Sequence, residues 1–169
     1  MQGVTRIMYH TQEKRAKQLL EPIICTRNDA WLGNGYYFWL EENDAVLWGH
    51  NSKKATGYFE IYKADICCND VLDTVFNEVH YNFWVQQIEK IAKNFLKKTG
   101  QKPTIKEINV YLRNKWGDEV TGILFQDNPI NKQLMVENFP YKKRVQIVVY
   151  KLNIVSNFTF HDEMECVKL

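Results

Sequence analysis

The chain lacks the runs and residues that mark several large classes of protein. No apolar run reaches 18 residues, so no membrane span is expected. The N-terminus has no charged segment followed by an apolar one, which predicts no secretory signal. The four cysteines contain no Cys-x-x-Cys pair and fit neither a disulfide framework nor a zinc site. A reducing, cytoplasmic location is therefore expected.

Nucleotide and metal motifs are also missing. There is no P-loop and no Gly-x-Gly-x-x-Gly segment that opens a helix, so neither a kinase-like nor a Rossmann cofactor site is indicated. The four histidines show no paired ligand spacing, and no metal site is predicted. The formal net charge of +2 is too small to indicate nucleic-acid binding by itself.

What the chain does have is aromatic side chains, at 14% of its residues. Aromatic residues at this density either fill a core or line a flat pocket. The 169 residues are enough for one domain with a core and too few for two, so residues 1–169 are expected to form a single domain.

Hydrophobic spacing predicts strands separated by a helical middle. Strands are expected at residues 4–10, at a short run ending at Trp39, and at residues 57–66, 121–126, 144–150 and about 154–160. Short helices are expected at residues 11–20 and, from a cap at Asn43 or Asp44, through Trp48. This order favours an α+β fold over a regular alternation of strands and helices.

The helical middle spans about residues 77–116. Apolar side chains recur at helical spacing over residues 81–95, and Gly100 predicts the end of that helix. Thr104 and Glu107 form a capping-box pattern for a second helix. Residues 86–116 hold eight Lys or Arg and two Glu. This excess predicts a solvated face, with a docking face for an acidic partner as the alternative.

Three short segments carry chemistry and occur in a fixed order. They are Tyr9-His10-Thr11, then Gly33-x-Gly35-x-Tyr37-Phe38 with Trp48 eleven residues after Tyr37, then the run from Arg144 through Gln146 to Tyr150. Glycines permit a close approach of a ligand to the main chain, and the following aromatic residues suggest a cleft for a planar ring.

These segments resemble the motifs of the ADP-ribosyltransferase superfamily, and most closely its His-Tyr-Glu branch of diphtheria-type toxins and poly(ADP-ribose) polymerase catalytic domains. The form with Trp39, Ala45 and Trp48 is also similar to small bacterial members, some of them toxin-like. The resemblance runs from about Met8 to Phe160. It implies a split β-sandwich of two small, mainly antiparallel sheets around an NAD cleft, with the helical pair embedded.

The resemblance also implies roles for individual residues. His10 would hydrogen-bond the adenosine ribose of NAD, and Tyr37 and Trp48 would stack on the nicotinamide ring. Gly35, with Thr11 in the His motif, would lie near the carboxamide. Gln146 stands where the family has its catalytic Glu, and it would orient the nicotinamide ribose. The catalytic residues implied are thus Gln146, Tyr37 and His10.

Three positions depart from the family pattern. Thr11 replaces a Gly, Ala45 replaces a Ser that binds the carboxamide, and Gln146 replaces the Glu. A neutral amide can orient a hydroxyl but carries no charge to stabilise an oxocarbenium-like transition state. Replacement acids are available in the sequence, namely Glu60, Asp127 and Glu137.

The function expected from the resemblance is mono-ADP-ribosyl transfer from NAD, as substrate, to a protein or nucleic-acid acceptor, with NAD hydrolysis beside it and no metal. One alternative is a binding module of the same fold that has lost catalysis. Another is a nucleic-acid-directed toxin that uses the basic face at residues 90–115.

Overall fold

The computed structural model describes residues 4–53, 55–127 and 143–167. Its elements, in chain order, are β1 Thr5–Glu13, β2 Tyr36–Trp39, α1 Glu42–Ser52, β3 Tyr58–Cys67, β4 Val71–Asp73, α2 Glu78–Thr99, α3 Ile105–Trp116, β5 Gly122–Gln126, β6 Val145–Val149 and β7 Val155–Glu165, with a single 3₁₀ turn at Leu152–Ile154 before β7. The α+β class expected from the sequence is confirmed.

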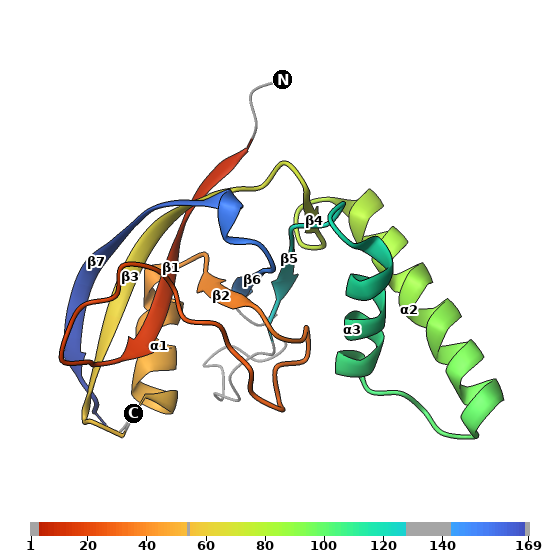
Figure 1. Cartoon of the computed structure of the whole chain (residues 1–169), viewed down its shortest axis with the longest axis horizontal. Helices are drawn as coiled ribbons and strands as arrows, with labels where there is room; N and C mark the ends of the chain where they lie inside the picture. Colours follow the sequence, from red (N-terminus) through yellow and green to blue (C-terminus); the bar gives the residue numbers. More distant parts are fainter. Residues whose placement is uncertain (1–3, 54, 128–142, 168–169) are drawn as a thin grey trace, which may run out of the picture.

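The strands form one seven-stranded sheet in the order β4-β5-β6-β2-β1-β3-β7, as Figure 1 shows. All neighbouring strands are antiparallel except β4 and β5. The expectation of two separate sheets is therefore wrong as stated. The reason lies at the centre, where β1 and β2 are joined by a single registered pair, Tyr9 with Trp39. This seam links two well-paired halves into one sheet.

Helices cover one face of the sheet on either side of the seam, α1 on one side and the α2–α3 pair on the other. Alternate residues of a strand point to the same face, so Tyr37 and Trp39 of β2 share a face. Trp39 packs with Ala45 of α1 and the strands beneath it, whereas Tyr37 packs against the cluster that contains Leu112 of α3. The opposite face carries the main core around Phe38.

The helical pair agrees with its prediction. Gly100 ends α2 with a φ of 72°, and Thr104 and Glu107 exchange both hydrogen bonds of the capping box at the start of α3. Trp84 on α2 donates to Asn109 on α3 at 3.1 Å, which fastens the two helices to each other. The pair lies beside the β4 edge of the sheet (Figure 1).

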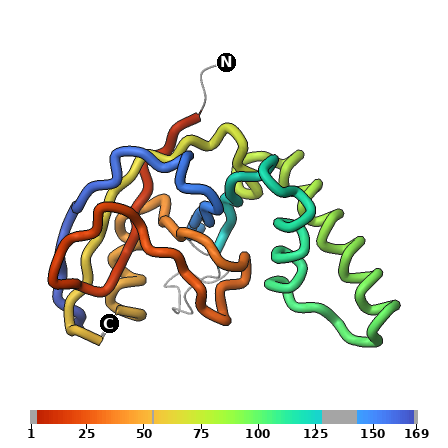
Figure 2. The backbone as a smooth tube through the Cα atoms, in the orientation of Figure 1, coloured from red at the N-terminus to blue at the C-terminus, as the bar shows by residue number. Residues whose placement is uncertain are grey.

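Two local expectations are wrong. Residues 11–13 continue β1 instead of starting a helix, because they pair with Ile61, Glu60 and Phe59 of β3. The segment after them, residues 14–35, crosses the molecule towards α3 without helix (Figure 2). The cap of α1 is Glu41, with no side-chain cap bond. Asp44 makes a buried ion pair with Arg144 instead.

Candidate functional site

A cavity of about 120 Å³ opens on the helix-covered face at the seam. It is lined by His10, Thr11, Gln12, Ile23, Cys25, Arg27, Asp29, Ala30, Trp31, Tyr37, Trp39, Trp48, Lys53, Asp127 and Gln146. The lining comes from β1, segment 14–35, β2, α1, β6 and the end of β5. Five of the six site residues expected from the sequence are in this set, and Gly35 is the exception.

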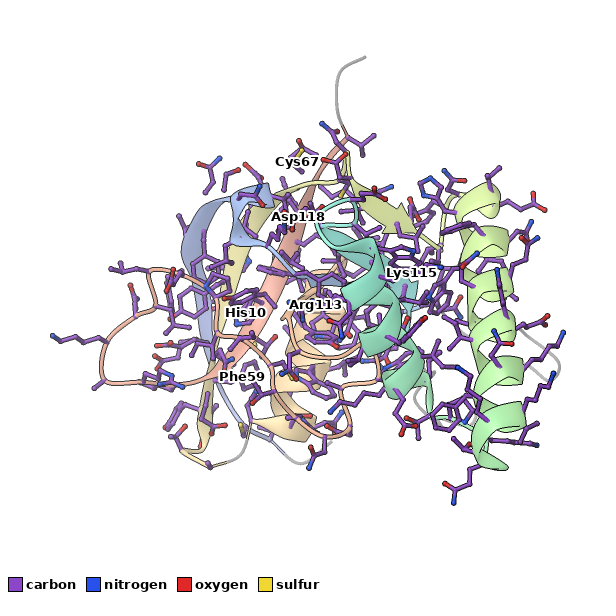
Figure 3. The ribbon with its side chains drawn as sticks, turned by 45° about the vertical axis from the view of Figure 1, so that its right-hand side comes forward. His10, Phe59, Cys67, Arg113, Lys115 and Asp118 are labelled. Atoms are coloured by element: carbon purple, nitrogen blue, oxygen red, sulfur yellow. The ribbon has the colours of Figure 1, made fainter. Side chains whose placement is uncertain are left out.

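His10 bridges the two strands where their backbones no longer pair. Its Nδ1 lies 2.9 Å from the carbonyl oxygen of Tyr37, and the Ile23 amide donates to its Nε2 at 3.3 Å. These contacts fix a neutral ring that is protonated on Nδ1. Burial lowers the pKa of His10 to about 4, with Lys53 lowering it further and the bond to Tyr37 opposing the shift. Figure 3 shows His10 inside the sheet region.

Tyr37 is held at both ends of its side chain. Its hydroxyl donates to the carbonyl of Gly33 at 2.8 Å, and its ring meets Phe125 edge to face at 6.3 Å between centroids. Burial raises the pKa of the Tyr37 phenol, so the side chain stays neutral. Gly33 has a φ of 83°, a conformation that favours glycine, and so this turn aims the carbonyl at the Tyr37 hydroxyl.

Trp48 forms a wall of the cavity from α1. Its ring lies 6.0 Å from that of Trp39, tilted by 51°. The Arg27 guanidinium lies 5.5 Å from the centroid of the Trp48 ring, within the range of a cation–π contact. Aromatic surface from two elements therefore borders the cavity, with a cation beside it.

Gln146 occupies the centre of β6, opposite Trp39 on β2 and Phe125 on β5. It is only 8% exposed and lines the cavity. No described residue accepts from or donates to its side-chain amide in the hydrogen bonds of the structure. A buried amide usually has partners, so this one is available to a ligand in the cavity.

A carboxylate lies in the same cavity. Asp127, at the end of β5, pairs through its backbone with Arg144 and through its side chain with the Arg144 guanidinium at 3.3 Å. The Arg144 guanidinium also lies 3.4 Å from Asp44 and 4.5 Å from the Trp39 ring centroid. Among the candidate replacement acids that lie in the described part of the chain, Asp127 lines the cavity and Glu60 does not.

The other two acids are elsewhere. Glu60 is buried on β3, outside the cavity lining, and accepts a hydrogen bond of 2.5 Å from Tyr62. Glu137 lies outside the described residues.

Gly35 and Thr11 serve the scaffold in this structure. Both backbone groups of Gly35 bond to Cys25, and a Cβ there would lie 2.4 Å from Val148 of β6. Glycine is therefore required by close packing on β6. The Thr11 hydroxyl donates to the Ala45 carbonyl at 2.9 Å, which ties β1 to α1 at the cavity edge.

Sequence reasoning named Asp127 but missed the other charged residues of the lining, Arg27, Asp29 and Lys53. Arg27 and Asp29 stood in a polar loop with no periodicity, and Lys53 followed the end of a helix. The sequence of such a loop has no periodic pattern that would predict which of its side chains face a cavity. The cation–aromatic neighbours Arg27 and Trp48 are 21 positions apart, so only the tertiary fold brings them together.

Over the described ranges, no helix is long and apolar enough to cross a membrane. Over the same part of the chain, no group of three or more His, Cys, Asp or Glu side chains could hold a metal ion. Comparisons of the chain with protein-family models, with curated proteins and with solved structures found no match.

Proposed function

We propose that this protein binds NAD in the cavity at the seam and transfers ADP-ribose to a macromolecular acceptor, with water as a competing acceptor. One observation carries the proposal. His10, Tyr37, Trp48 and Gln146, which are far apart in the sequence and were selected by motif order, line a single cavity. If the likeness of these short motifs were due to chance, there would be no reason for all four residues to line the same cavity. The single sheet with a one-pair seam is, on this proposal, a variant of the split ADP-ribosyltransferase sheet.

The aromatic lining supports a site for the nicotinamide ring. Tyr37 is fixed by Gly33, and Trp48 stands on α1 at the same cavity. Rigid aromatic walls bind a planar ring at low entropic cost. Because the cavity is small and open to solvent, the rest of the dinucleotide would extend towards its mouth.

The reaction proposed breaks the bond between the nicotinamide nitrogen and the ribose anomeric carbon, and the electron pair leaves on nicotinamide. A lone pair of the acceptor forms the new bond to that carbon, and the acceptor loses a proton. Gln146 would orient the ribose hydroxyls through its available amide. Asp127 would supply the negative charge that Gln146 lacks, and it would take the proton.

The assigned role of His10 changes on this account. Both of its ring nitrogens are engaged by backbone groups, so a direct bond from Nε2 to a ribose requires the 3.3 Å contact with Ile23 to open. We therefore place His10 first as the residue that holds Tyr37 and the seam in position. A ribose hydroxyl that displaces the Ile23 amide would donate to Nε2 in the same way.

A catalytically inactive NAD-binding module is the second candidate, and the neutral Gln146 favours it. The two candidates share binding and differ in nicotinamide release. Calorimetry with NAD and with nicotinamide tests binding, and release of labelled nicotinamide tests transfer or hydrolysis. An absence of heat and of thermal shift at millimolar NAD would contradict both candidates.

The α2–α3 face is proposed as the place where an acidic acceptor docks. Lys90, Lys93 and Lys97 are exposed along α2. A groove of about 330 Å³ runs between the helices, with Phe95, Ile108 and Tyr111 among its apolar residues. The charged residues that line the groove are Lys98 and Glu107. Exposed lysines along α2 fit a partner that carries negative charge.

A further inference from the structure

Lys53 is the charged side chain of the cavity lining that makes no ion pair with the described residues. Among the charged groups that line the cavity, Arg27 is paired with Asp29, and Asp127 is paired with Arg144. No carboxylate of the described residues lies within ion-pair distance of the Lys53 ammonium. Burial lowers the pKa of Lys53, the positive charge of Arg27 lowers it further, and the negative charge of Glu13 opposes the shift. The cavity therefore holds a half-buried cation that an anionic ligand would stabilise.

The second cation, Arg27, is fixed before any ligand arrives. Its Nε donates to one oxygen of Asp29 at 2.8 Å, and its Nη2 donates to the other at 2.5 Å. The Lys106 ammonium of α3 donates to the Arg27 carbonyl at 3.1 Å, which holds this part of the loop against the helix. A guanidinium so placed loses little freedom when it binds a ligand.

We propose that Lys53 and Arg27 form a subsite for a diphosphate group at the cavity. Lysine binds phosphate as a point charge. The Arg27 guanidinium keeps N–H donors on Nη1 and Nη2 beyond the two that it gives to Asp29, so the two residues together suit two adjacent phosphates. The inference rests on the proposed function in one respect, since the diphosphate of NAD is the ligand group intended. The subsite can also be tested independently of NAD, because any diphosphate ester presents the same two phosphate groups to Lys53 and Arg27.

The test uses calorimetry with NAD, ADP and nicotinamide against the full chain and its variants. Lys53→Gln removes the charge and keeps most of the length of the side chain. Lys17→Gln is the matched control, because Lys17 is exposed and is not among the residues that line the cavity. We expect Lys53→Gln to weaken NAD and ADP roughly 10-fold or more, as for loss of a charge-assisted contact, and to leave nicotinamide affinity unchanged. Lys17→Gln should behave as wild type.

The remaining outcomes bear on the subsite, on the proposed function or on both. NAD that binds wild type and Lys53→Gln equally would overturn the subsite and leave the proposed function intact. ADP binding that depends on Lys53, with no binding of nicotinamide, would support the subsite and contradict the nicotinamide cleft. No binding of any of the three to wild type would overturn both. A loss of all three affinities in Lys53→Gln that Lys53→Arg does not restore would overturn the subsite.

Discussion

A single buried histidine joins the two halves of the sheet at the point where the cavity opens. Each ring nitrogen of His10 has a backbone partner, one on β2 and one in segment 14–35. Protonation would add a hydrogen to Nε2, which then could no longer accept from Ile23. The pKa of about 4 expresses this cost, with burial as its main cause.

His10 should therefore make folding stability depend on pH. Its pKa falls from an ordinary value of 6.5 to about 4 in the fold, so the unfolded chain binds more protons between these values. The contribution of His10 to the free energy of unfolding is fully present above pH 6.5 and is lost as pH falls towards 4. The loss amounts to up to about 3 kcal/mol. Urea unfolding at pH 7 and pH 4.5 measures the loss, and His10→Gln removes this part of it. Parallel losses in wild type and His10→Gln would contradict the assignment.

Tyr37 has two separable parts, a ring and a hydroxyl. Tyr37→Phe deletes only the bond to Gly33 and should cost about 0.5–1.5 kcal/mol of stability while nicotinamide still binds. Tyr37→Ala removes the ring as well and should abolish nicotinamide binding by the folded protein. Melting temperature and nicotinamide affinity are measured on both variants. Folded Tyr37→Ala protein that still binds nicotinamide like wild type would show that the ring is only packing.

At the scale of elements, the helical pair could be predicted from the sequence, whereas the extended form of residues 11–13 could not. Helical spacing, the Gly100 cap and the Thr104 capping box are local signals, because each depends only on residues that are close together in the chain. Residues 11–13 gave no such signal, because their extended form is imposed by pairing with β3 some fifty positions later. β4 was missed for a similar reason, since its three residues are fixed by parallel pairing with β5.

The capping box gives a direct test of the helical pair. Thr104→Ala removes the hydroxyl that accepts from the Glu107 amide and should lower stability by about 0.5–2 kcal/mol. Thr26→Ala is the matched control, because Thr26 is exposed in segment 14–35 and its hydroxyl makes no hydrogen bond with the described residues. Urea midpoints of the two variants are compared. A Thr104→Ala loss no larger than that of Thr26→Ala would contradict the role of the cap.

The lysines of α2 make a second prediction for the helical pair. Changing Lys93 and Lys97 to Glu should weaken binding of an acidic acceptor to the basic face and leave NAD affinity unchanged, because neither residue lines the cavity. A single-stranded oligonucleotide is one probe, and its binding should fall steeply with salt as counterions are displaced. Binding that ignores salt and charge reversal, or none at low salt, would leave these lysines as a solubilising face.

At the scale of the whole molecule, the sequence predicted the site residues but not the seam between β1 and β2. Motif order selected His10, Tyr37, Trp48 and Gln146, and the fold brings these four to one cavity. Their spacing could not show that β1 and β2 meet at one pair, because register depends on packing across the sheet. Nor could it show the cations, which reach the cavity from a loop and a helix end.

The central proposal is that this cavity cleaves NAD and that Gln146, which lines it, contacts the nicotinamide ribose. Removing its amide in Gln146→Ala should slow nicotinamide release by roughly 10-fold or more and leave NAD affinity nearly unchanged, because the contact strengthens as the ribose gains positive charge. Gln146→Glu adds a negative charge at that point and should raise NAD hydrolysis.

The measurement that tests the claim most directly is nicotinamide release from labelled NAD by wild type, Gln146→Ala and Gln146→Glu under one condition. The predicted order of rates is Gln146→Glu highest, wild type next and Gln146→Ala lowest, with similar NAD affinities in all three. Equal rates in all three proteins, whether zero or not, would contradict the claim that Gln146 acts at the reacting ribose of NAD.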